Sequence, residues 1–459
     1  MAGEGGEGGI RTPGTLLAYG SLANYWFKPL THLSRRATKV RKTGDFLVNR
    51  IFTRSMQKLT RSEISLLLTL ALIQFTLILD GMIMMPMAPN LKDTMHITSQ
   101  QFGFLVSSYG FAAFFSAIFA TFWIDRFDRK NVLLFLYAGF IVGTAGCALA
   151  PGYGFFLGMR IFTGLFGGIA GAVILSIIGD VISLEKRGRA MGILMSGFSM
   201  AAVIGVPIGI VLSENYNWHV PFYMICAIGI LIFAGIWITV PKATSHIQNV
   251  SAERETLFKK VFTNKNQVRA LAFSLCLVIA HFGIIPFISD YQVNNNGFDM
   301  KTEVIYIYVV GGLLTVITSP VIGKLADRYG RIKVFTVLNF LSVIPILLIS
   351  HFNSDSLAAL LGASALFFIF SGARMVPASA MITSAVEPAW RGGFMSLNSA
   401  IQQLGVAVTT IIGGLIITND AEGKLHNYNI VGYIAVAATV VVYFLGRGVL
   451  VAPGQKHDL

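Results

Sequence analysis

Charged side chains inside long apolar segments are the residues of this chain that could do chemistry. Asp80 lies 16 residues after Ile64 in one apolar segment, and Arg160 lies five residues after Phe155 in another. At a helical rise of about 1.5 Å per residue, two helices that cross a ~30 Å core in opposite directions bring both side chains to a similar depth. An aspartate beside a guanidinium stays ionised until its surroundings change, and then it can take up a proton. The spacing therefore predicts a proton-exchanging ion pair, with a permanent structural ion pair as the alternative.

A second set of candidate residues lies further along the chain. His281 falls within an apolar segment. Because histidine changes charge near neutral pH, His281 is a further candidate proton carrier, with a plain hydrogen-bonding role as the alternative. Arg374 falls near the middle of another apolar segment, where it could attract an anionic group of a substrate or be held by carbonyl groups.

Polar and sulfur-containing side chains at helical spacing outline a candidate substrate cavity. One face consists of residues spaced by four, namely Thr76, Asp80 and Met84. The other face has spacings of four, three and four, and consists of Asn398, Gln402, Gly405 and Thr409. The alternatives are ordinary packing for the methionine and hydrogen bonds to neighbouring helices for the two amides.

The segments that must position these residues are long and apolar. Of the 459 residues, 54% are hydrophobic and only 12% are charged, which excludes a soluble globular protein of this length. Windows of about 20 apolar residues, the length that a helix needs to cross a membrane, recur along the chain. We predict an all-α integral membrane protein with twelve transmembrane helices, at 64–87, 101–122, 132–150, 155–181, 190–212, 220–240, 268–289, 303–324, 333–352, 357–385, 394–417 and 429–447.

The placement of Lys and Arg predicts how these helices are oriented. If both termini and the even-numbered connections are cytoplasmic, then of the 35 basic residues only Lys92, Lys301 and Lys424 lie outside, and only Arg160 and Arg374 lie within helices. The net charge of +13 then belongs to short cytoplasmic loops that face anionic lipid. We therefore expect a multi-pass protein of the cell membrane that does not bind nucleic acid.

A repeated basic motif marks two of the cytoplasmic connections. The sequence GKLADRYGRIKV at 323–334 has a diverged copy, TFWIDRFDRKNV, at 121–132, and their aspartates Asp327 and Asp125 are 202 residues apart. We expect Gly323 to permit close helix approach, Gly330 to adopt a positive φ, and Asp327 to accept hydrogen bonds from a neighbouring helix N-terminus. We call these segments the signature loops. Their candidate residues are Asp125, Arg126 and Arg129 in the first and Gly323, Asp327, Arg328, Gly330 and Arg331 in the second.

The repeat resembles the signature loops of the major facilitator superfamily of transporters, and the resemblance runs from about residue 62 to 450. It implies two pseudo-symmetric six-helix halves, conformational switching at the signature loops, a small-molecule substrate, a monomer within membrane lipid, and no cofactor, with a proton gradient as the energy source. Arg160-x-x-x-Gly164 is similar to a motif of drug/proton antiporters, in which the arginine assists proton exchange. The segment with Gly205, Pro207 and Gly209 resembles, imperfectly, an exporter motif and bacterial permeases predicted to export arabinose or other sugars. Helix packing and a kink are its other reading.

The expected domain organisation follows. Residues 1–55 form a basic extension that is either disordered or a miscalled start before Met56, because Gly8–Ser34 resembles the peptide read from a transfer-RNA gene. Residues 56–240 and 268–459 form the two halves, and a polar cytoplasmic linker at 241–267 joins them.

The expected function is transport rather than catalysis. The sequence contains no phosphate loop, metal-binding His/Glu pair or nucleophile elbow. Its cysteines, Cys147, Cys226 and Cys276, have no paired spacing, so we expect neither a disulfide nor a metal site. We predict a secondary transporter that works by alternating access, with proton-coupled efflux of drug-like compounds or sugars as the activity. Uptake or facilitated diffusion is the alternative within transport, and a non-transporting membrane sensor is the alternative outside it.

Overall fold

The computed structural model describes residues 59–120, 127–183, 186–241, 260–387 and 390–452. Internal contacts divide the chain into two units, Met1–Leu59 and Thr60–Leu459, and the fold described below is that of the second unit. The proposed extension at 1–55, most of the proposed linker at 241–267 and the last seven residues lie outside the described part of the chain.

Twelve helices of the described part are long and apolar enough to cross a membrane, which confirms the predicted number. We number them as spans 1 to 12 in chain order. Spans 1 to 6 make the first half: α2 (Arg61–Met82), α4 (Ser99–Ala120), α5 (Arg129–Ala148), α6 (Tyr153–Val181), the succession α7 (Arg187–Met200), η2 (Ala201–Gly205) and α8 (Val206–Asn215), and α9 (Val220–Thr239). Spans 7 to 12 make the second half: α11 (Lys265–Phe282) with α12 (Ile285–Asn296), η3 (Met300–Val304) with α13 (Ile305–Tyr329), α14 (Arg331–Leu341) with α15 (Val343–Ser350), α16 (Leu357–Phe367) with η4 (Phe368–Gly372) and α17 (Met375–Ser384), α18 (Arg391–Ile416), and α19 (Tyr428–Arg447).

Prolines account for several breaks in these spans. A proline removes one backbone donor and disfavours helical geometry in the residue before it. The first span was predicted to reach residue 87, but α2 ends at Met82 and the turn that follows contains Pro86. Span 7 breaks between α11 and α12 just before Pro286, and span 5 widens into the π-helix η2 just before Pro207. A short helix that was not predicted, α3 (Ala88–Met95), follows span 1.

Polar residues at the helix starts fix where several spans begin. Thr60 caps α2 in a capping box, because its side chain accepts from the Glu63 backbone while the Glu63 carboxylate accepts from the Thr60 backbone. Asp128 caps α5 and Asn264 caps α11 more simply, because each side chain accepts from backbone N–H groups of the first helical turn. These caps satisfy N–H groups that the first helical turn leaves without partners.

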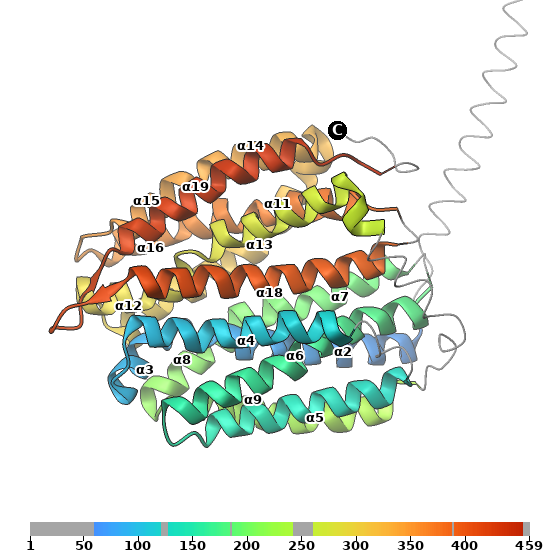
Figure 1. Cartoon of the computed structure of the whole chain (residues 1–459), viewed down its shortest axis with the longest axis horizontal. Coiled ribbons are helices and arrows are strands. Elements are labelled where there is room, and N and C mark those ends of the chain that lie inside the picture. The colour runs from blue at the N-terminus through green and yellow to red at the C-terminus, as the bar shows by residue number, and fades with distance from the viewer. Residues whose placement is uncertain (1–58, 121–126, 184–185, 242–259, 388–389, 453–459) are drawn as a thin grey trace, which may run out of the picture. The chain divides into compact units, whose positions relative to one another are not determined.

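The two ends of the helix bundle differ in their connections. At one end, on the right of Figure 1, lie the second signature loop and the described part of the first, and we call this the signature-loop end. At the other end, on the left, α3, α12 and a small hairpin come together, and we call this the hairpin end. The hairpin consists of β1 (Thr418–Asn419) and β2 (Leu425–His426), which pair antiparallel between spans 11 and 12.

Glycines allow the two halves to approach closely along spans 2 and 11. In Figure 1, α4 and α18 run side by side through the middle of the bundle. A Cβ atom added to Gly103 would lie 3.1 Å from the Cα of Gly414, and one added to Gly110 would lie 2.9 Å from the Cβ of Ala407. Small residues that let backbones meet are typical of helix interfaces in membranes.

Candidate functional site

The ion pair expected from the sequence is present inside the first half. Arg160 on α6 donates from Nη1 to Oδ2 of Asp80 on α2 over 2.6 Å, and both side chains are buried. Thr144 on α5 lies within hydrogen-bond reach of the second carboxylate oxygen, at 3.4 Å. The guanidinium lies over the ring of Tyr109 on α4, 4.7 Å from its centroid. Four spans of one half therefore enclose the pair.

Within the described part of the chain, one hydrogen-bond donor of this buried pair remains without a partner. The Nε atom of Arg160 is buried and has no hydrogen-bond partner among the described residues. A buried charge that loses its ionic partner destabilises an apolar bundle, so each member of the Asp80–Arg160 pair depends on the charge of the other.

The neighbouring candidates on span 1 do not form the expected cavity face. Thr76 is fully buried, and its hydroxyl is hydrogen-bonded to Tyr137 on α5 over 2.9 Å. Met84 is also fully buried and lies in the turn after α2, because the helix ends at Met82 ahead of Pro86. The prediction that Thr76, Asp80 and Met84 share one helical face is therefore wrong at Met84, and Thr76 faces the inside of the first half.

The candidates on span 11 contact helices of their own half. Gln402 donates to the Ser274 hydroxyl on α11 over 3.4 Å, which is the helix-bonding role left open by the sequence. Thr409 is buried near the break between α11 and α12, where a Cβ on Gly283 would lie 3.6 Å from its hydroxyl oxygen. Asn398 is buried too, and its Oδ1 atom has no partner among the described residues.

Arg374 occupies the interior of the second half, and no carboxylate among the described residues pairs with it. Its Nη1 atom donates to Asn339 at 3.0 Å, Ser342 at 2.9 Å and Thr439 at 3.2 Å, side chains that belong to spans 9 and 12. Its Nε and Nη2 atoms are buried with no partner in the described part of the chain. Neutral side chains rather than backbone carbonyl groups thus hold this guanidinium.

His281 lies beside this group and is held by a hydroxyl. Its Nδ1 atom is 2.9 Å from the Ser371 hydroxyl, and its ring stacks on Phe367 with centroids 5.5 Å apart. His281 follows Asp80 by 201 residues, close to the 202 that separate the two signature loops. By the spacing of the signature loops, His281 thus lies one residue before the position that corresponds to Asp80.

The glycines of span 5 serve helix packing. A Cβ on Gly205 would lie 2.8 Å from Leu79 of α2, and one on Gly209 would overlap Ile83. Pro207 is the second residue of α8, which follows the π-helix η2 directly, and the glycines of the motif pack span 5 closely against span 1. This is the packing reading of the motif, and it places span 5 against the helix that carries Asp80.

The described part of the first signature loop is anchored by an ion pair. Arg129 at the start of α5 lies 3.1 Å from Asp180 near the end of α6. This contact joins spans 3 and 4 at the signature-loop end. Asp125 and Arg126 lie outside the described residues.

The second signature loop agrees with the sequence at one position and differs at two. Gly330 has φ of 93°, as expected. Gly323 makes no close approach, since the nearest atom to an added Cβ is Val376 Cγ1 at 4.0 Å. Asp327 is exposed and accepts no hydrogen bond from any described residue, and it lies within the last turn of α13, which continues to Tyr329. Arg328 lies over the Tyr329 ring, and Arg331 begins α14.

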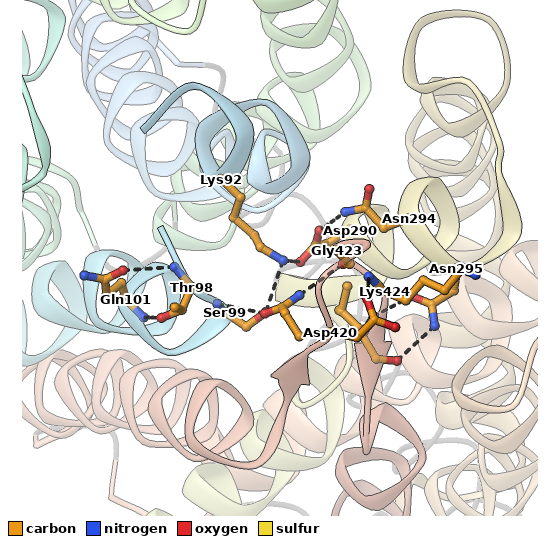
Figure 2. Close-up of polar contacts among 12 residues, drawn as sticks. Lys92, Thr98, Ser99, Gln101, Asp290, Asn294, Asn295, Asp420, Gly423 and Lys424 are labelled. Atoms are coloured by element: carbon orange, nitrogen blue, oxygen red, sulfur yellow. Dashed lines mark hydrogen bonds and ion pairs between the residues drawn. The ribbon is translucent and has the colours of Figure 1, made fainter. Parts of the chain in front are cut away.

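Sequence reasoning missed a polar network at the hairpin end. Lys92 of α3 and Asp290 of α12 form an ion pair of 2.7 Å, and Figure 2 shows the side chains around it. The sequence analysis places Lys92 outside the membrane and assigns it no partner. Asp290 directly follows a predicted apolar segment, and this position was the only signal in the sequence.

Known proteins with similar sequences and structures are membrane transporters, which agrees with the twelve membrane-spanning helices. The family model for the Major Facilitator Superfamily matches residues 70–323 and 300–457. The uncharacterized MFS-type transporter YtbD of Bacillus subtilis (strain 168) is 24% identical over 399 residues, which cover 84% of this chain and 96% of that protein. Multidrug resistance protein 1 of the same organism is 25% identical over 369 residues, which cover 78% of this chain and 91% of that protein. Among solved structures, a bacterial homolog of the human lysosomal transporter Spinster, in an inward-facing and unoccupied conformation, has a TM-score of 0.70 at 16% identity and covers 86% of this chain and 100% of that one.

Proposed function

This chain belongs to the major facilitator superfamily, and on that premise we propose that it exports a small organic molecule across the cell membrane in exchange for protons. As a member of that family it is a multi-pass secondary transporter and not an enzyme. Transport in this family proceeds by rocking of one half against the other around a central site. The proposal concerns the energy source, the direction and the class of substrate.

The observation that carries proton coupling is the buried pair of Asp80 and Arg160. Protonation of Asp80 would leave the guanidinium without its counter-charge, and an unpaired buried charge costs about 3–5 kcal/mol. The charged and the protonated form of Asp80 therefore favour different packings of spans 1, 3 and 4. Span 5 packs closely against span 1, so a change in the packing of span 1 also affects span 5. Such a dependence is what coupling a proton to a conformational change requires.

Export of a drug-like compound is supported by two likenesses. Arg160 and Gly164 match the spacing of the drug/proton antiporter motif, and the chain is similar along most of its length to Multidrug resistance protein 1. The test is flux into vesicles that contain the purified protein, with an imposed pH gradient and a panel of lipophilic cations and neutral sugars. Saturable flux that follows the pH gradient is expected for a lipophilic member of the panel. Saturable flux that ignores the gradient would refute proton coupling in favour of facilitated diffusion.

The orientation we propose places the signature-loop end in the cytoplasm. It follows from the distribution of Lys and Arg, and it makes the hairpin end extracellular. Gly152, between spans 3 and 4, and Gly188, at the start of span 5, both have no atom within 4 Å of an added Cβ. They lie at opposite ends and are matched sites for a reporter cysteine.

Labelling of intact cells with a membrane-impermeant maleimide should therefore distinguish the two positions. The background protein has Cys147, Cys226 and Cys276 replaced by Ala, since all three are free thiols. We expect Gly152→Cys to react in intact cells and Gly188→Cys to react only after permeabilisation. The reverse pattern would show that the protein is inserted the other way round.

A further inference from the structure

Polar contacts between the two halves gather at the hairpin end. The ion pair of Lys92 with Asp290 joins α3 of the first half to α12 of the second. Ser99 at the start of α4 contacts Asn419 of β1, and Lys301 of η3 contacts Asn215 at the end of α8. Ion pairs at the other end, such as Arg129 with Asp180 and Lys260 with Glu387, stay within one half.

The Lys92–Asp290 pair is buried although it lies beyond the middle of the bundle. Only 7% of the Lys92 side chain and none of the Asp290 side chain is exposed. Asn294 donates to the second carboxylate oxygen of Asp290 over 2.7 Å, and the Lys92 ammonium also donates to the Ser99 hydroxyl over 3.2 Å. Two charges from different halves are thus removed from water only while this end is closed.

The hairpin makes a second crossing between the halves. The Oδ1 atom of Asn419 accepts from both the backbone N–H and the hydroxyl of Ser99, at 3.2 and 2.7 Å. The hairpin is in turn fastened to α12, because Asn295 exchanges two hydrogen bonds with the backbone of Leu425, at 2.9 and 2.8 Å. Figure 2 shows these side chains converging from α3, α4, α12 and the hairpin.

Together these contacts form a closed ring. It runs from Asp290 to Lys92, then to Ser99, to Asn419 and through the hairpin to Asn295, which lies on the same helix as Asp290. The ring crosses between the halves twice. Opening the hairpin end must break both crossings, whereas every contact inside either half can persist.

We propose that this ring is a latch on the extracellular side, and that the Lys92–Asp290 pair sets the balance between the state closed at the hairpin end and the state open there. The proposal rests on the proposed function for its orientation and its alternating access. In the closed state, removal of one partner leaves the other charge buried and unpaired, whereas in the open state water hydrates it. Each single neutralising substitution should therefore favour opening.

The test is a distance measurement between two spin labels at the hairpin end. Labels are placed at Gly152→Cys in the first half and Asp355→Cys in the second, two positions outside the ring. Electron–electron resonance in the purified full chain then reports the populations of short and long distances. We expect Asp290→Asn and Lys92→Met each to raise the ratio of long to short distances by on the order of tenfold or more, and Asn419→Ala to raise it less, because that substitution strands no charge.

Two further variants make the result specific to the pair. Exchanging the charges in Lys92→Asp with Asp290→Lys should return the distances towards those of the parent protein. Lys424→Ala is the matched control, because it removes a lysine at the same end whose partner Glu422 lies within the hairpin and is exposed. Unchanged distances in both single neutralised variants would overturn the latch, and so would an equal opening in Lys424→Ala. Because the labels report conformation and not flux, this outcome is independent of whether protons drive transport.

Discussion

Asp80→Asn should abolish pH-driven transport while exchange of substrate down its own gradient persists. The amide keeps the size and hydrogen-bonding reach of the carboxyl group, so Thr144 and Arg160 retain a neighbour of the same shape. It cannot bind or release a proton in the physiological range, so the imposed pH gradient no longer does work on the substrate. We expect accumulation ratios in vesicles to fall to that of protein-free vesicles, while counterflow of labelled substrate continues.

The control for this variant is Asp80→Glu, which keeps a titratable carboxyl group beside Arg160. It should retain pH-driven flux at a reduced rate, because the longer side chain must be fitted into a fully buried position. Flux is expressed per folded molecule, measured by size-exclusion chromatography. If Asp80→Asn only lowers the amount of folded protein and each folded molecule keeps its pH dependence, the pair is a structural clamp and coupling must be sought at His281.

Gly110→Leu should slow transport by disfavouring the close approach of α4 and α18 at the boundary between the halves. A Cβ here already lies 2.9 Å from both Ala407 Cβ and the Gln403 carbonyl oxygen of α18. Overpacking of this kind costs about 1–3 kcal/mol. Because the two helices belong to different halves, separation of the halves relieves the strain, and the cost becomes roughly a 5- to 150-fold shift towards the open state. The distance between the labels at positions 152 and 355 measures that shift.

Two other glycines separate this effect from simple unfolding. A Cβ on Gly168 would lie 2.5 Å from Ala113 within the first half, so Gly168→Leu should lower thermal stability and yield instead of changing the distance. Gly158 has no atom within 4 Å of an added Cβ, so Gly158→Leu should be near neutral in both measurements. Equal losses of stability in Gly110→Leu and Gly168→Leu would contradict the role assigned to the boundary.

The features that the sequence predicted correctly are those governed by local composition. The twelve spans could be predicted from the length of the apolar segments. The positive φ of Gly330 could be predicted because a glycine in a tight turn between two helices is suited to that conformation. The pairing of Asp80 with Arg160 could also be predicted, because the depth of a residue in the membrane follows from its distance in sequence from the end of its helix. Burial of an unpaired charge is costly enough to make that match meaningful.

The features that the sequence did not predict depend on which way a helix is turned and on which distant segments meet. Spacing by four places Thr76 and Asp80 on one face, but it does not say that this face points to α5 instead of a cavity. Asp290 and Lys92 are 198 residues apart, and Lys92 lies on the short helix α3, which the apolar pattern does not predict. The motif places Asp327 in a loop, whereas in the structure it lies in the last turn of α13, which continues to Tyr329.

The unequal charge of the two half interiors bears on membrane voltage. Asp80 neutralises Arg160 in the first half, whereas Arg374 lies in the second with only neutral hydrogen-bonding partners among the described residues. One elementary charge carried across a membrane at 100 mV involves about 2.3 kcal/mol. Rocking moves Arg374 through only a fraction of the membrane field. If that fraction is a tenth, the electrical work at 100 mV is about 0.2 kcal/mol per cycle. The interior of the second half therefore carries a net charge on which the membrane voltage acts. The interior of the first half would carry one only while Asp80 is protonated.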